Sequence, residues 1–168
     1  FGLERNLAVL QGVDSVFDTD ELARLIARAA ALTGVDYGAA GASDVSLRIL
    51  AEHARTMTFL VSDGVFPSNE DRGYVLRRIM RRAVRHAYLL GVDELVTPAL
   101  VDEVVAVMGD DYPDLRKNHD FVRGVVEREE TRFRQTLKTG SVLLDDELGR
   151  PPEGGVLDGR VAFTLHDT

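Results

Sequence analysis

The sequence contains no cysteine, and only 5 of its 168 residues are proline. Without cysteine the chain can form neither a disulfide nor a thiolate metal site, which is compatible with a reducing cytosol. It also lacks any apolar run near the roughly 20 residues that span a bilayer, and no signal-peptide pattern opens it. We therefore predict a cytoplasmic location, no membrane partner and no bound metal.

Patterns of known active sites are missing as well. No segment matches a catalytic Ser/His/Asp set, a P-loop or a Rossmann glycine motif. The 4 histidines have neither the i,i+4 spacing nor the carboxylate neighbours of metal ligands; they are His53, His86, His119 and His166. The acidic clusters at 127–130 and 145–147 are typical of solvated helix faces. No complete catalytic site is therefore predicted within this chain.

Hydrophobic residues recur along the chain at helical spacing, and no stretch alternates with the period of a strand. The pattern predicts an all-α fold of about six or seven helices. We place them at residues 3–10, 18–34, 43–62, 68–90, 97–109 and 118–148, with a short last helix after Asp158. Thr97, followed by Pro98, is expected to cap the helix that begins there. The segment Asp110–Lys117, which carries Pro113, is predicted to be a loop.

The residues from Pro67 to His86 form the most polarised segment of the chain. Ser68, with Asp71 three residues later, indicates a helix N-cap with a capping box. At about 100° per residue, the predicted helix has an apolar side that consists of Leu76, Ile79, Met80, Ala83, Ala87 and Leu90. Its opposite side carries Arg77, Arg78, Arg81, Arg82 and Arg85. We expect the apolar side to pack on a core and the arginines to point outward as planar, permanently charged groups.

This row of arginines requires an anionic partner. Like charges at i,i+4 repel by about 0.2–0.5 kcal/mol per pair, and no acid follows Asp71 within the predicted helix. Nucleic-acid phosphates would satisfy the row. Carboxylates from other helices are the alternative, because the chain has a net charge of -8; the protein would then be a helical protein-interaction or interdomain scaffold. His86 extends the arginine side and could contact phosphate or interact with the dipole at the helix C-terminus.

Asn69 lies at the start of the same predicted helix. A carboxamide both donates and accepts hydrogen bonds, so it can read a base edge where a charge cannot. Asparagine is also common in turns for purely structural reasons. On the residues alone, Asn69 is therefore either a base-reading group or an ordinary turn residue.

Several motifs follow one another in a fixed order along the chain. The central ones are Asp44–Arg48, His53–Arg55 and Asp63–Arg78. Further motifs are Glu129–Phe133 with Thr136–Leu137, and Ala162–Phe163 with Asp167–Thr168. Their order resembles the central helical region of alanyl-tRNA synthetases. At the front, Gly2–Arg5 followed by Val9–Gln11 is similar to motif 3 of class II catalytic domains, although Asn6 stands where an apolar residue is expected.

The resemblance implies a ligase that activates alanine with ATP and transfers it to tRNA(Ala), with Mg²⁺ as a cofactor and zinc only in an editing domain outside this chain. Residues 1–14 would be the tail of the class II catalytic domain, with Arg5 and Gly2 at the ATP phosphates. Residues 15–168 would be the helical tRNA acceptor-stem recognition domain, truncated at its C-terminal end. Because the earlier catalytic motifs are missing, this chain alone is predicted to be inactive and to bind none of these cofactors.

The resemblance also implies the partners, which are the tRNA(Ala) acceptor stem and the catalytic domain of the ligase, but not DNA. Asn69 would read the G·U wobble pair of the stem, whose groove-edge groups are shifted relative to a Watson–Crick pair. A second base-reading residue, an aspartate, is expected beyond Thr168. The arginines expected to hold the backbone of the stem are Arg72, Arg77, Arg78, Arg81, Arg82 and Arg85, with some of them pairing instead with internal acids.

Overall fold

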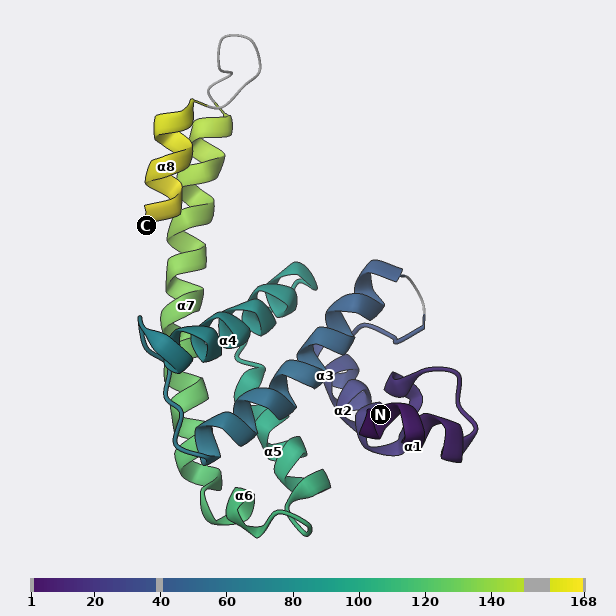
Figure 1. The fold of residues 1–168 in the computed structure, drawn as a ribbon. Coiled ribbons are helices and arrows are strands. Elements are labelled where there is room, and N and C mark those ends of the chain that lie inside the picture. The colour runs from purple at the N-terminus through teal and green to yellow at the C-terminus, as the bar shows by residue number, and fades with distance from the viewer. Residues whose placement is uncertain (1, 39–40, 150–157, 168) are drawn as a thin grey trace. The chain divides into compact units, whose positions relative to one another are not determined.

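The computed structural model describes residues 2–38, 41–149 and 158–167, and all regular structure within these ranges is helical (Figure 1). The predicted all-α fold class is therefore confirmed. The helices are α1 (Leu3–Gln11), α2 (Asp20–Thr33), α3 (Gly41–Ser62), α4 (Asp71–Leu89), α5 (Thr97–Met108), α6 (Pro113–Lys117), α7 (His119–Leu148) and α8 (Gly159–Asp167). A 3-10 turn, η1 (Val16–Asp18), lies between α1 and α2. None of the described helices is long and apolar enough to cross a bilayer.

The chain divides into two compact units, Phe1–Glu130 and Thr131–Thr168. The first unit contains α1 to α6 and the beginning of α7, and the second contains the rest of α7 and α8. The candidate site described below belongs to the first unit. The side chain of His166 and the whole of Thr168 lie outside the described residues. The boundary expected after residue 14 stays a prediction.

α3 is the central helix of the first unit and packs against α2, α4, α5 and α6. Its buried residues recur at the spacing of one helix face and include Leu47, Leu50, Ala54, Met57 and Val61. α4 contributes Leu76, Met80, Ala83 and Ala87 to the same core. Burial of each large side chain contributes about 1.5–3 kcal/mol, so α4 is held on α3 with its arginine side turned away from the core. Ile79 and Leu90, expected on the apolar side, are only half-buried.

The end of α3 determines where the chain enters the candidate site. α3 ends at Ser62, and Gly64 follows with a φ of 86°. This left-handed conformation is accessible to glycine because it has no Cβ. The turn leads the chain into the segment 65–70, which precedes α4.

One segment that was predicted to be a loop is helical. Residues Pro113–Lys117 form α6. Pro113 occupies the first helical position, where its fixed φ favours a helix and its missing N–H is not needed. Leu115 is buried in the core, so packing stabilises a helix too short to form by itself.

Two acidic residues that were expected on a solvated helix face lie in the interior instead. Glu130 is 1% exposed, and Glu129 is 6% exposed. The Glu130 carboxylate accepts hydrogen bonds of 2.6–3.2 Å from the backbone N–H groups of Val96 and Thr97 and from the Thr97 hydroxyl. The capping group of α5 is therefore Glu130 rather than Thr97, whereas Pro98 lies in the first turn as expected.

Candidate nucleic-acid interface

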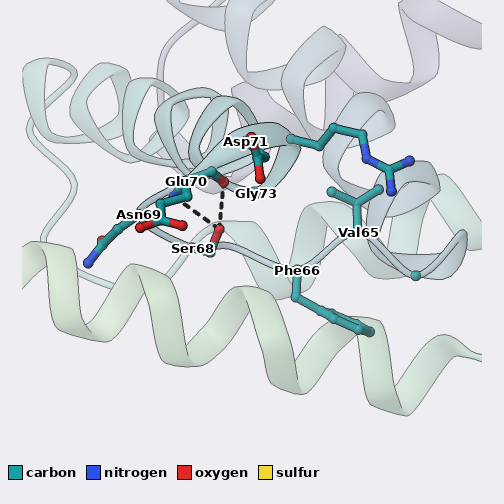
Figure 2. Close-up of a pocket in the computed structure, with 9 residues that line it drawn as sticks. Val65, Phe66, Ser68, Asn69, Glu70, Asp71 and Gly73 are labelled. Carbon is teal, nitrogen blue, oxygen red and sulfur yellow. Dashed lines mark hydrogen bonds between the residues drawn. The ribbon is translucent and has the colours of Figure 1, made fainter.

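The chain between α3 and α4 shapes a surface pocket at the start of α4 (Figure 2). The pocket has a volume of about 650 Å³ and is lined by residues 64–66 and 68–73. Phe66 makes an edge-to-face contact with Phe121 at the beginning of α7, with ring centroids 5.6 Å apart. This contact anchors one end of the segment that carries Asn69.

Ser68 folds this segment back on itself. Its hydroxyl donates a 2.8 Å hydrogen bond to the Glu70 carbonyl and accepts one of 3.4 Å from the Glu70 N–H, as Figure 2 shows. The predicted capping box is therefore wrong. The N-cap residue is Glu70, whose side chain makes no capping bond, and the helix begins at Asp71. The short serine side chain bonds to nearby backbone groups in a turn and so competes with helix capping.

Asp71 and Gly73 mark two backbone constraints in the first turn of α4, a positive φ and a close approach of another segment. Asp71 is the only described non-glycine residue with a positive φ, at 49°, a conformation that strains an L-residue by roughly 1 kcal/mol or more. A Cβ added at Gly73 would lie 2.9 Å from the Ser68 Cβ and still closer to the Phe66 carbonyl oxygen. Only glycine therefore lets the segment Phe66–Ser68 rest directly on α4.

Asn69 is exposed, and its orientation is set by α4. Its Oδ1 accepts a hydrogen bond from the Arg77 guanidinium, which lies further along the helix. The Asn69 amide nitrogen donates no hydrogen bond to any other described residue. The structure therefore leaves the N–H groups of this side chain available to a ligand, while Arg77 holds the carbonyl end.

The arginines of α4 divide into exposed and partly buried members. Arg72, Arg78, Arg82 and Arg85 are exposed. None of them forms an ion pair with a carboxylate within the part of the chain that the structure describes. The Arg78 guanidinium lies over the Tyr74 ring, 5.8 Å from its centroid, within the range of a cation–π contact. These cations can therefore meet an external anion.

Arg81 is different, because its Nε donates a 2.8 Å bond to the Glu129 carboxylate of α7. The Glu129 side chain is only 7% exposed, whereas that of Arg81 is 29% exposed. A carboxylate buried to this extent requires a charged partner. Arg81 therefore pairs with an internal acid, as the scaffold alternative requires. Helical periodicity did not distinguish Arg81 from the other arginines of α4.

Two histidines lie at the junction of α3 and α4. The Nδ1 atom of His86, on α4, is 3.0 Å from the Ser46 hydroxyl of α3. Both His53, on α3, and His86 are half-buried. Burial, followed by the charges of Arg82 and His86, lowers the pKa of His53 to about 4. Burial, followed by the charges of Arg82 and Arg85, lowers the pKa of His86. Sequence spacing indicated His86 but gave no reason to associate His53 with it.

The residues expected at ATP lie elsewhere in the first unit. Gly2 is the N-cap residue of α1, and Arg5 lies exposed in its first turn. Figure 1 shows α1 apart from α4, with α3 between them. The neighbouring Glu4 is paired with Arg55 of α3 at 2.9 Å, while Arg5 forms no ion pair with another described residue. Arg5 and the arginines of α4 therefore lie on different helices of the first unit. No group of three or more potential metal ligands occurs among the described residues.

A comparison with protein-family models matches residues 1–168 to the family described as tRNA synthetases class II (A). The chain therefore belongs to this family of class II tRNA synthetases. The resemblance drawn from the motifs is also confirmed by curated relatives. Alanine–tRNA ligases are 52% identical over 167 residues in Caulobacter sp. (strain K31), 50% over 167 in Acidithiobacillus ferridurans and 48% over 170 in Thermobifida fusca (strain YX). Each match covers 99% of this chain but only 19% of the relative.

Proposed function

We propose that this chain is the tRNA-recognition portion of an alanine–tRNA ligase, an enzyme that activates alanine with ATP and attaches it to tRNA(Ala). Membership of the class II family and the named relatives support this assignment. We further propose a cytoplasmic location, residues 15–168 as the helical recognition domain and residues 1–14 as the tail of the catalytic domain. The observation that carries the proposal is the exposed arginine side of α4 with Asn69 at its leading end.

The arginines would hold the phosphate backbone of the acceptor stem. Arg72, Arg78, Arg82 and Arg85 are exposed and have no internal carboxylate, so phosphates would relieve their mutual repulsion. Arg77 would contribute while it orients Asn69. Arg81 would contribute less than the exposed arginines, because its Nε is bonded to Glu129. These contacts give affinity and register but no sequence information.

Asn69 would supply base discrimination at the G·U pair. Its free N–H groups favour an acceptor on a base edge. The wobble geometry displaces the acceptors of both bases relative to those of a Watson–Crick pair. Arg77 and the closely packed segment Phe66–Ser68 hold the Asn69 side chain in one position. Because the side chain cannot move with a displaced acceptor, its hydrogen bond forms with only one of the two base-pair geometries.

Arg5 and Gly2 would serve the ATP side of the reaction. The exposed Arg5 guanidinium has the chemistry to hold a phosphate. A Cβ at Gly2 would meet only the Arg5 side chain, at 3.8 Å, so Gly2 leaves room beside that group. The described residues contain no group of ligands for Mg²⁺ or zinc, and these ions would belong to other parts of the longer ligase.

The proposal is tested by Asn69→Ala. We expect its binding to an RNA hairpin with the G·U acceptor stem to weaken by about tenfold, and its binding to the G·C version to change by less than about twofold, because one base-edge contact contributes about 1–3 kcal/mol. Fluorescence anisotropy with both hairpins measures the two affinities. Equal losses on the two stems would exclude base reading by Asn69.

Arg78→Gln is the matched control on the same helix. Because phosphate contacts do not depend on sequence, this variant should weaken both hairpins equally and reduce the slope of log affinity against log salt by about 0.7–0.9. If neither hairpin binds the unaltered chain, the scaffold alternative, which the Arg81–Glu129 pair favours, replaces RNA recognition.

A further inference from the structure

A cluster of cationic and titratable side chains lies where α3 packs on α4. We propose that His53 and His86, together with Arg82 and Arg85, form a proton-coupled site for one backbone phosphate of the RNA stem. This inference rests on the proposed function, because the phosphate belongs to the same RNA. It adds the two histidines to the interface and makes RNA binding depend on pH.

The cluster is built by two helices. Arg82, Arg85 and His86 fall within about one turn of α4. On α3, Ser46 and His53 lie seven residues apart, which places them on the same side of that helix. The 3.0 Å contact between the Ser46 hydroxyl and the His86 ring joins the two helices at this position. His53 is half-buried on that side of α3, and the charges of Arg82 and His86 contribute, after burial, to the lowering of its pKa.

The hydrogen bonds of Ser46 decide which nitrogen of His86 can meet a phosphate. The Ser46 hydroxyl lies 3.3 Å from the Ala42 carbonyl oxygen and 3.0 Å from Nδ1 of His86. We assign the hydroxyl proton to the Ala42 carbonyl, so that the Ser46 oxygen accepts a bond from Nδ1–H of His86. In the neutral ring, Nε2 then carries a lone pair and repels a phosphate oxygen. Protonation converts Nε2 into a donor, so the ring can bind phosphate only in its charged form.

The surroundings of the cluster favour an anion. The permanent charges that act on the rings are cations: Arg82 acts on both rings, and Arg85 acts on His86. Both arginines are exposed, and neither is paired with a carboxylate in the described residues. Burial, followed by these charges, lowers the pKa of both rings, so they are neutral at pH 7 in the free protein. A phosphate would reverse this balance, because it stabilises each imidazolium.

The direction of the pH dependence follows from this change. In the free protein both histidine pKa values lie below the usual 6.5, that of His53 at about 4. A bound phosphate raises both pKa values. At a pH between the pKa values of the free protein and those of the complex, the complex therefore holds more protons than the free protein. RNA affinity should therefore rise as the pH falls from 7.5 to 5.5, by up to about tenfold per pH unit for each coupled proton.

The experiment measures the binding of the complete 168-residue chain to the G·U acceptor-stem hairpin at pH 7.5, 6.5 and 5.5 and constant ionic strength. We expect affinity to increase by at least about fivefold over this range. Isothermal titration calorimetry at pH 6.0, in buffers of different ionisation enthalpy, should show net proton uptake on binding. In His53→Gln and His86→Gln the increase should fall to less than about twofold.

His119→Gln is the matched control. It removes a histidine that contacts Asp102 of α5 at 2.7 Å and lies outside the cluster. General charge effects of acidification are common to all variants, so this one should keep the full increase in affinity. Circular dichroism checks that each variant is folded; if the glutamine variants are not, proton uptake by the unaltered chain decides.

The outcomes separate the two proposals. Hairpin binding at pH 7.5 without proton uptake at lower pH would overturn the phosphate site and leave the proposed function standing. An equal increase in His53→Gln, His86→Gln and His119→Gln would also overturn it. Absence of hairpin binding at every pH would overturn the proposed function and this inference together.

Discussion

Asn69 is exposed, and three nearby residues set its orientation. Gly73 lets the segment Phe66–Ser68 lie against α4, since any Cβ there would collide with it. Ser68 closes the turn through Glu70. Arg77 holds the amide oxygen of Asn69. A base-reading side chain needs this support, because discrimination between base edges depends on a fixed position.

Asp71 allows the strain in this turn to be measured. Its φ of 49° lies in the left-handed region, where glycine is favoured over alanine by roughly 1 kcal/mol. Asp71→Gly should therefore be more stable than Asp71→Ala by about 1 kcal/mol in urea unfolding. The comparison of two variants at one position removes the effect of losing the carboxylate. Equal stabilities would show that the residue is not strained in solution.

At the scale of helices, the beginning of α7 connects α4 to α5 through two adjacent carboxylates. Glu129 holds Arg81 of α4. Glu130 accepts the backbone donors at the start of α5. Both carboxylates are buried, so removing Glu130 leaves the buried donors of Val96 and Thr97 unsatisfied. Removing Glu129 takes away the partner of Arg81 Nε. The direction of the arginine side is therefore fixed by α7 as well as by the apolar core.

Glu130→Ala should lower the free energy of unfolding by about 3 kcal/mol, because it leaves buried donors of Val96 and Thr97 unsatisfied. Urea denaturation followed by circular dichroism measures the change. Glu127→Ala, at an exposed position of the same helix, should change stability by less than about 0.5 kcal/mol. If the two variants lose the same stability, the cap on α5 contributes little.

At the scale of the whole molecule, a protein with a net charge of -8 presents a helix side with exposed, unpaired arginines. Such a distribution repels a polyanion from most approaches and attracts it to one surface, so charge would orient the RNA before contact. The junction of α3 and α4 also affects the stability of the fold. Burial there, followed by the charges of Arg82 and His86, lowers the pKa of His53 to about 4 in the folded state.

This depressed pKa predicts acid sensitivity. In the unfolded chain His53 has its ordinary pKa of 6.5, so on acidification the unfolded state takes up the proton first. Stability should therefore be lost between about pH 6.5 and pH 4. In urea unfolding at pH 7 and pH 5, His53→Gln should lose less stability than the unaltered chain. Identical pH dependence in the two proteins would refute the neutral, half-buried His53.

The sequence by itself determined the helices, the core-facing side of α4 and the family, because these depend on local periodicity and on motif order. It did not reveal α6, because Leu115 gains its burial from distant residues. It also misplaced the start of α4, since Ser68 and Gly73 interact only after the chain has turned.

Only the tertiary structure decided which charges are internal. Glu129 and Glu130 have the same local pattern as solvated acids, and Arg81 has the same spacing as the exposed arginines. His53 and His86 lie on different helices, and only the packing of α3 on α4 lets one influence the pKa of the other. The physical reason is that burial and pairing are set by what another helix places opposite a side chain, and periodicity along one helix contains no information about it.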